Sequence, residues 1–306
     1  MLDQATRLRE MAAAYRAQAS GTSPHRMHAI AVTSGKGGVG KTNVSINLAH
    51  ALLAAGKEVL LMDVDLGMAN ADILLGTVPP YHLGHFLRGE KDILQVIHKT
   101  SNKLKLIAGG SGFVELGNLS ADKLQPVLRN LKRLEDEADY LILDTGAGLG
   151  DSVLEFVLAA DQVVVVTTPE PTALADAYTM IKAMYYRNAK VDVKLVVNQA
   201  ERPEEGAAVA ERIGTTARDF LGLKIEHVGT IPRDPHVWQS VRLKVPFYVG
   251  YPNAPASRAV HSIAQRLIHT ESGQGSGGGG TGTKSVIGSF FDRLGGLFGK
   301  RNSGAV

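Results

Sequence analysis

Nine consecutive residues near the start of the chain have the types and the spacing that bind phosphate groups. Residues 34–42 read SGKGGVGKT and fit the frame G-x-x-x-x-G-K-T. In this frame backbone N–H groups converge on phosphates, the last lysine reaches their terminal end, and the threonine hydroxyl can hold Mg²⁺. We therefore predict that ATP and Mg²⁺ bind at Gly35, Lys36, Gly37, Gly38, Val39, Gly40, Lys41, Thr42 and Asn43.

The loop carries a second lysine, Lys36, near its beginning. At this place the side chain points away from the phosphates of its own chain, so its target would lie across a symmetric partner. An overlapping G-x-G-x-x-G spacing leaves a dinucleotide site as an alternative, which the residues Gly40-Lys41-Thr42 disfavour. A glycine-rich turn without a ligand is the other alternative.

Three aspartates follow apolar runs and could complete such a site. Asp63 and Asp65 are one residue apart on a strand, so they point to opposite faces and only one can serve the site directly. We expect Asp65 to orient water or Mg²⁺ near the γ-phosphate, and Asp63 to anchor the loop or support the metal indirectly. Asp144 ends the run Tyr140-Leu141-Ile142-Leu143, the arrangement that reaches Mg²⁺ through water. All three could instead be caps at strand ends.

The segment after Asp144 reads TGAGLGD, and its glycines would allow a switch loop. Asp151 could belong to that loop or merely cap the next helix. We find no Ser-His-acid set and no metal-spaced histidine cluster in the sequence. Hydrolysis would therefore depend on positioning and charge neutralisation rather than on a strong general base.

The elements that must position these residues alternate along the chain. Continuous apolar runs mark strands buried on both faces, at 28–33, 58–62, 104–107, 140–143, 162–167, 193–197 and 225–230. Helical patterns fill the gaps at 43–55, 120–137, 150–159, 171–187, 204–219 and 255–269. We predict an α/β fold, a doubly wound and mostly parallel sheet of seven to eight strands with helices on both faces.

Composition limits the function classes. The chain has 306 residues, no cysteine, 44% hydrophobic residues and a net charge of +3. No apolar run is long enough to span a bilayer and no signal peptide opens the chain, so we expect a cytoplasmic protein. The positive charge lies in the two tails and the central stretch is slightly acidic, so we expect no specific binding of nucleic acid.

We divide the chain into four segments. Residues 1–26 form an N-terminal helix and joint, 27–270 an ATPase domain, 271–284 a glycine-rich linker and 285–301 a C-terminal helix. The C-terminal helix is amphipathic, with glycines 295 and 296 on its polar side. Its apolar arc holds Val286, Ile287, Phe290, Phe291, Leu294, Leu297 and Phe298.

Such a helix with basic neighbours is expected to lie in the interface of an anionic membrane, and to be largely unfolded until it binds. Alternatively, the apolar arc docks on its own domain. The helix could also dock in one state and bind the membrane in another.

These motifs resemble the MinD/ParA class of deviant Walker-A ATPases, a branch of the SIMIBI-like P-loop NTPases. The resemblance covers about residues 28–269 and implies an ATP-bound homodimer in which Lys36 contacts the partner's phosphates. It also implies that Asn198 and Pro232 frame adenine. The branch usually has proline where this chain has Gly146. Iron–sulfur relatives need cysteine ligands and are excluded.

The N-terminus resembles the D-Q-A-x-x-L-R signature of flagellar-number regulators of the FlhG/FleN/YlxH type. The matching residues are Asp3, Gln4, Ala5, Leu8 and Arg9. The resemblance implies a helix that activates the FlhF GTPase, although a helix packing on its own domain is an alternative.

We therefore expect a Mg²⁺-dependent ATPase switch that regulates flagellar number or placement, held reversibly at the inner face of the cell membrane. Flagellar switch or transcriptional regulators are further candidate partners. A DNA-segregation ATPase of the ParA type and a MinD-like division-site regulator are the alternatives.

Overall fold

The computed structural model describes residues 26–65, 70–109, 112–117, 119, 121–273 and 288–303. The predicted N-terminal helix, with Asp3, Gln4, Ala5, Leu8 and Arg9, lies outside these residues, as do Val286 and Ile287.

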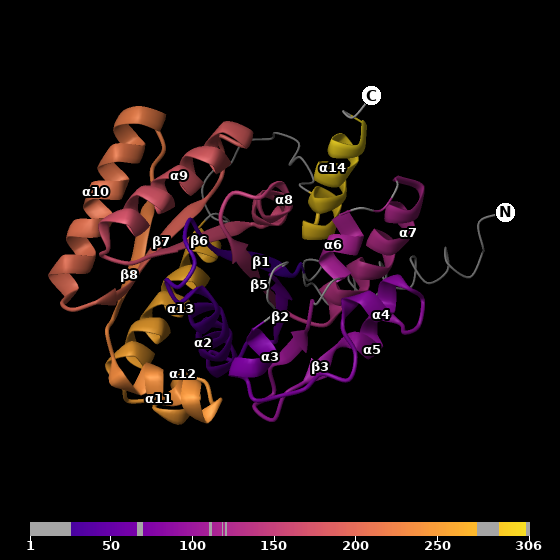
Figure 1. The fold of residues 1–306 in the computed structure, drawn as a ribbon, viewed down its shortest axis with the longest axis horizontal. Coiled ribbons are helices and arrows are strands. Elements are labelled where there is room, and N and C mark those ends of the chain that lie inside the picture. Colours follow the sequence, from indigo (N-terminus) through magenta and orange to yellow (C-terminus); the bar gives the residue numbers. More distant parts are fainter. Residues whose placement is uncertain are drawn as a thin grey trace.

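One sheet of eight strands forms the centre of the fold, in the order β3-β4-β2-β5-β1-β6-β7-β8 (Figure 1). Every neighbouring pair is parallel except β3 and β4. The strands are β1 (His28–Ser34), β2 (Val59–Val64), β3 (His98–Lys99), β4 (Lys105–Ile107), β5 (Tyr140–Ala147), β6 (Gln162–Thr167), β7 (Val193–Ala200) and β8 (Glu226–Pro232). The predicted fold class is therefore confirmed, and all seven predicted strands form.

The parallel strands are buried on both faces because the helices that connect them cover both sides of the sheet. In β1, Ala29 and Ala31 enter one core whereas Ile30 and Val32 enter the other, and all four are fully buried. A strand whose two faces both lose contact with water needs a continuous apolar run, which β5 and β6 also have.

Five of the predicted helices lie between strands: α2 (Lys41–Ala54), α7 (Ala121–Leu131), α8 (Asp151–Ala159), α9 (Pro171–Arg187) and α10 (Pro203–Leu221). The sixth, α13 (Pro255–Gly273), follows the last strand. The predicted helix 120–137 divides at residue 132 into α7 and the 3₁₀ helix η1 (Lys132–Asp136). Among the described residues six further helices were not predicted: α3 (Ala71–Leu74), α4 (Leu83–Leu87), α5 (Ile93–Val96), α6 (Gly112–Gly117), α11 (Pro235–Leu243) and α12 (Phe247–Gly250).

The helices cover the two faces unequally. Helices α2, α12 and α13 bury their apolar residues in the core on one face, and most of the apolar residues of α7, α8, α9 and α10 enter the core on the other. The C-terminal helix α14 (Phe290–Ser303) closes the second face, where it packs against α7 and α8 (Figure 1).

The structure corrects two expectations about the C-terminal helix. It is folded on its own domain, with Phe290, Phe291, Leu294 and Phe298 each 1% exposed, so the docking alternative describes this state. Gly295, which we placed on the polar side, faces α7, and a Cβ there would lie 2.5 Å from Leu128 Cδ1. Within the described residues α14 begins at Phe290, and the predicted start of the segment at residue 285 lies outside them.

Arginine 293 fixes the position of α14. Its guanidinium donates to Asp161 Oδ1 at 2.8 Å, to the carbonyl of Ala159 at 2.7 Å and to the carbonyl of Gly288 at 2.7 Å. Arg26, where the described part of the chain begins, donates to the same Asp161 oxygen at 2.8 Å. Asp161 therefore links the start of the domain to its C-terminal helix.

No helix in the described residues has both the length and the apolar character that crossing a membrane requires.

Candidate nucleotide-binding site

The predicted phosphate-binding loop joins β1 to α2, beside the middle of the sheet. Gly38 and Gly40 have φ angles of 81° and 91°, in the left-handed region that favours glycine. A Cβ on Gly40 would also lie 2.4 Å from the Asn198 amide nitrogen. The glycines are therefore required by the backbone path, which brings the N-terminus of α2 toward the cavity.

The loop opens onto a cavity of about 640 Å³. Gly37, Gly38, Gly40, Lys41, Thr42, Asn43, Asp65, Asn70, Ile73, Leu74 and Ala147 line it. Five of these residues come from the predicted loop, and a sixth, Asn43, was predicted to bind together with it. The contribution of α3 through Asn70, Ile73 and Leu74 was not predicted, because a single-turn helix has too few residues to show a periodic pattern.

Lys41 and Asp144 face each other across the base of the site. Lys41 is 8% exposed and Asp144 is 1% exposed. Burial raises the pKa of the Asp144 carboxyl, while the Lys41 charge and hydrogen bonds from Ser45 and Thr42 act in the opposite direction. The Ser45 hydroxyl donates to Asp144 Oδ1 at 2.8 Å. The structure thus brings Thr42 and Asp144, the predicted Mg²⁺ ligands, into contact.

The two aspartates after β2 have different surroundings. Asp63 is 1% exposed, and its carboxylate accepts hydrogen bonds from the backbone N–H groups of Asp65, Asn70 and Ala71 at 3.0–3.1 Å. Burial and the nearby Asp144 charge raise the pKa of Asp63 to about 7. Asp63 therefore anchors the loop that leads to α3, whereas Asp65 lines the cavity as expected.

Asn198 lies two residues before the end of β7, and Pro232 is the last residue of the neighbouring strand β8. The Asn198 amide is 9% exposed and donates to the carbonyl of Val39 at 2.8 Å, so it holds the phosphate-binding loop in place. Pro232 pairs with Ala200 at the same edge of the sheet. Their contact with adenine stays a prediction.

Lys36 makes contacts that the sequence did not predict. Its ammonium lies 2.6 Å from Glu170 Oε1 and 2.7 Å from the Thr172 hydroxyl, both at the start of α9. The Lys36 hydrogen bond lowers the pKa of the Glu170 carboxyl. In this state the second lysine is held by its own chain and contributes nothing to the lining of the cavity.

The predicted switch loop connects β5 to α8. Gly148 has a φ of 93°, and a Cβ on Gly146 would lie 3.3 Å from Asp65 Oδ1. Asp151 is the first residue of α8, and the N-cap is Gly150, without a side-chain cap hydrogen bond, so Asp151 is not the N-cap residue. Its carboxylate instead pairs with Arg187 at 2.6 Å.

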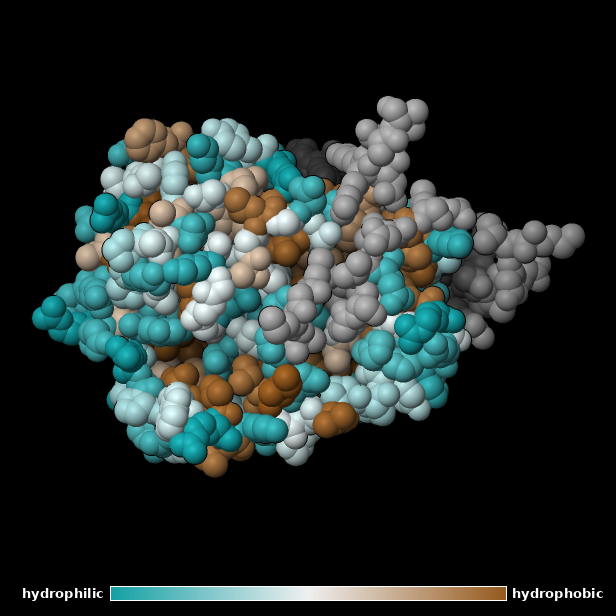
Figure 2. All heavy atoms as spheres, in the orientation of Figure 1, coloured by the Kyte–Doolittle hydropathy of each residue, from teal (hydrophilic) through white to brown (hydrophobic). Residues whose placement is uncertain are grey.

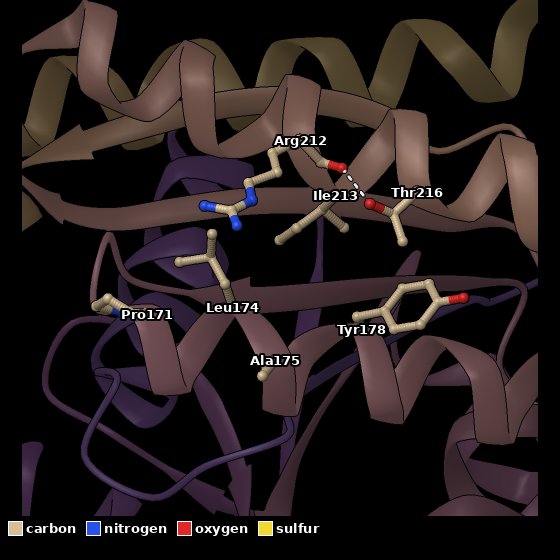
Figure 3. A pocket seen from close by; sticks show the side chains of 7 residues that line it. All are labelled: Pro171, Leu174, Ala175, Tyr178, Arg212, Ile213 and Thr216. Atoms are coloured by element: carbon tan, nitrogen blue, oxygen red, sulfur yellow. Dashed lines mark hydrogen bonds between the residues drawn. The ribbon is translucent and has the colours of Figure 1, made fainter.

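A second hollow lies between α9 and α10 (Figure 3). Pro171, Leu174, Ala175, Tyr178, Arg212, Ile213 and Thr216 line it, and the Thr216 hydroxyl donates to the carbonyl of Arg212 at the position drawn with a dashed line. Its lining is mostly apolar and contains no glycine-rich loop, so the phosphate chemistry belongs to the cavity at the end of β1.

Comparison with known proteins identifies the family of this chain. A family model for ParA, described as NUBPL iron-transfer P-loop NTPase, matches residues 25–268. The chain belongs to the ParA family of P-loop NTPases. Thiolate ligands are absent, since the sequence contains no cysteine.

The chain is also similar to individual proteins of known name. The antiactivator FleN of Pseudomonas aeruginosa is 36% identical over 80% of this chain and 88% of its own length. The flagellum site-determining protein YlxH of Helicobacter pylori is 35% identical over 78% of this chain and 81% of its own length. The septum site-determining protein MinD of Pyrococcus horikoshii, solved in complex with Mg-ADP, shares the fold, with a TM-score of 0.64 and 23% identity over 80% of this chain and 97% of its own.

Proposed function

We propose that this ParA-family protein is an ATP-dependent, dimerising and membrane-associating ATPase that regulates flagellar number or placement. The observation that carries the proposal is the site itself, in which Lys41 and Thr42 line one cavity at the start of α2, and the buried Asp144 lies next to both. The similarity to FleN and YlxH supports a flagellar role, and the Mg-ADP complex of a protein with the same fold supports the choice of ligand.

The residues of the site have separate tasks in this proposal. Backbone N–H groups at residues 37–42 bind the phosphates, Lys41 neutralises their terminal charge, and Thr42 with Asp144 holds Mg²⁺. The metal would stabilise the charge that develops on the transferred phosphoryl group. Asp65 orients water beside that group, and Asp63 keeps the Asp65 loop in place through its three backbone contacts.

Dimerisation requires Lys36 to change partner. Glu170 and Thr172 hold it in the present state, so closing the dimer replaces these contacts with the phosphates bound by the second copy. An exposed ion pair is weak, and phosphate oxygens compete with it effectively. We assign Lys36 this role in the dimer.

Membrane association requires α14 to leave its groove. The buried phenylalanines that now pack on α7 and α8 would then form the apolar face of an interfacial helix. A single short helix binds lipid weakly, and a dimer presents two copies, so the ATP state would be the membrane-bound state.

The N-terminal segment supplies the flagellar partner in this proposal. Its D-Q-A-x-x-L-R sequence would activate an FlhF-like GTPase, with Gln4 as the residue that orients water there. A peptide of residues 1–20 is expected to stimulate such a GTPase, and Gln4→Ala should remove the effect. A peptide without effect would leave the division-site alternative in place.

The central experiment is co-sedimentation of the full chain with anionic liposomes, in ATP or ADP, with and without residues 284–306. We expect ATP-dependent binding that needs those residues, and no ATP binding in Lys41→Ala. Salt-sensitive, ATP-dependent binding to non-specific DNA by a chain ending at His269 would instead favour a DNA-segregation ATPase.

A further inference from the structure

The exposed hydrophobic side chains of this protein are concentrated in one region. Among the described residues ten large hydrophobic side chains are exposed, and six of them form what we call the apolar patch: Ile73, Trp238, Val241, Leu243, Val245 and Val249. They come from α3, from α11, from the turn that follows it and from α12. Figure 2 shows hydrophobic surface gathered over these helices.

Packing contacts make the patch one surface. Val241 and Val245 line a small hollow together with Leu74 of α3. The turn after α3 presses against the turn after α11, since a Cβ on Gly76 would lie 3.0 Å from the carbonyl oxygen of Lys244. The patch therefore extends from the rim of the nucleotide cavity, where Ile73 and Leu74 also lie, to α12.

The charges on the α11 and α12 side of the patch have one sign. Residues 235–270 contain four Arg or Lys and no Asp or Glu. Arg242 and Lys244 alternate with Val241, Leu243 and Val245, and all five are exposed. The Arg242 guanidinium lies over the Trp238 ring at 4.7 Å, which keeps a cation within the apolar surface. The α3 side contributes one acid, Asp72.

We propose that the apolar patch is the docking surface for an acidic, amphipathic helix of a partner protein. Large aliphatic side chains of such a helix would cover Val241, Leu243 and Trp238, and its carboxylates would pair with Arg242 and Lys244. A second copy of this chain fits less well, because a twofold contact would place these same two cations against themselves.

The position of the patch couples this docking to the nucleotide. Asn70, Ile73 and Leu74 line the nucleotide cavity, and the Asp63 carboxylate holds the first N–H groups of α3. A nucleotide that shifts α3 also shifts Ile73 and Leu74 relative to Val241, so partner affinity depends on which nucleotide is bound. This dependence rests on the proposed function, whereas the docking surface itself does not.

Trp238 is the single tryptophan of the chain, so its fluorescence reports peptide binding at the patch. The experiment titrates the full chain with a synthetic helical peptide of about 18 residues that has leucines at i, i+3, i+4 and i+7 and glutamates elsewhere. We expect a blue shift of the tryptophan emission with a dissociation constant of roughly 10–100 µM, weakened by salt. Affinities measured with Mg-ADP and with a Mg-bound, non-hydrolysable ATP analogue are expected to differ by at least about threefold.

Matched variants test the surface. The double variant Leu243→Ser/Val245→Ser should lose the shift, and Phe220→Ser, which changes a side chain 79% exposed on α10, should keep it. The pair Arg242→Glu/Lys244→Glu should prefer the same peptide with lysines in place of the glutamates. Circular dichroism of each variant confirms that it is folded.

Several results would overturn the proposal: no shift with the acidic peptide, an equal shift with the lysine peptide, a shift caused by protein concentration alone, or a shift with anionic vesicles but without peptide. Equal affinities in both nucleotide states would refute the coupling. A failure of the proposed function can be distinguished from a failure of the docking surface. A chain that does not hydrolyse ATP or bind lipid would still bind the peptide in the ADP state.

Discussion

The ammonium of Lys36 lies 2.6 Å from the carboxylate of Glu170 in the same chain, although 134 residues separate them. The second lysine of the phosphate-binding loop is thereby kept at the start of α9. In the proposed dimer Lys36 must leave this contact to reach the second subunit, so we infer that the ion pair opposes dimerisation.

Removing the charge of Glu170 is expected to favour the dimer. In Glu170→Gln the carboxylate no longer attracts Lys36, and we expect the dimer association constant in a non-hydrolysable ATP analogue to rise roughly two- to fivefold, the size typical of an exposed ion pair. Sedimentation velocity measures the effect. Glu211→Gln changes an exposed acid on α10 and serves as the control; an equal rise in both variants would mean that net charge, and not Lys36, is responsible.

The role of Asp65 in hydrolysis can be tested separately from nucleotide binding. All three residues line the cavity, but Lys41 and Thr42 belong to the proposed phosphate-binding loop and Asp65 does not. We expect Asp65→Ala to keep ATP affinity, to reduce hydrolysis by roughly 100-fold, as expected for the loss of a group that positions water, and to trap the dimer on lipid. Phosphate release and liposome co-sedimentation are the two measurements. Unchanged hydrolysis would exclude this role.

The sequence predicted the sheet and the phosphate-binding loop well, because both are recorded in short runs of neighbouring residues. Strands buried on both faces need continuous apolar runs, and the loop needs glycines at fixed places. Strand β3 was missed because two residues show no periodicity.

Contacts between distant residues could not be predicted in this way. The bonds from Lys36 to Glu170 and from Asn198 to the carbonyl of Val39 join segments that only the completed fold brings together. The apolar face of α14 was recognised, but its position depends on the groove that α7 and α8 form. Ser45 is a partial exception, since its place one turn after Lys41 on α2 could have indicated that it faces the site.

A buried histidine should limit stability in acid. His50 on α2 is 4% exposed, its Nε2 has no hydrogen-bond partner, and burial lowers its pKa to about 4. The unfolded chain binds a proton near pH 6.5, before the folded chain does, so stability decreases as the pH falls from 6.5 to 4. The full loss amounts to about 3 kcal/mol.

The test compares urea unfolding of the native chain and of His50→Gln between pH 7 and pH 4. We expect the difference in unfolding free energy between the two proteins to change in favour of the variant by about 3 kcal/mol over this range. A difference that does not depend on pH would show that His50 has the same pKa in the folded and the unfolded chain, and would refute the prediction.

Two adjacent glycines in α14 provide the most direct test of whether its docking controls membrane binding. Gly295 is packed against Leu128, whereas nothing lies within 4 Å of a Cβ on Gly296. Replacing either by glutamine raises the helix propensity by about 1 kcal/mol and adds no apolar surface. Only Gly295→Gln also introduces a clash with α7, so the two variants differ in docking and not in helix formation.

We therefore expect Gly295→Gln to bind anionic liposomes in ADP, and Gly296→Gln to require ATP as the native chain does. Co-sedimentation measures this, and protease sensitivity of the C-terminal segment reports its release independently. If both variants bound lipid equally in ADP, helix propensity would control the interaction. If neither did while Gly295→Gln became protease-sensitive, a released α14 would be insufficient for membrane binding, and the switch would have to act through another surface.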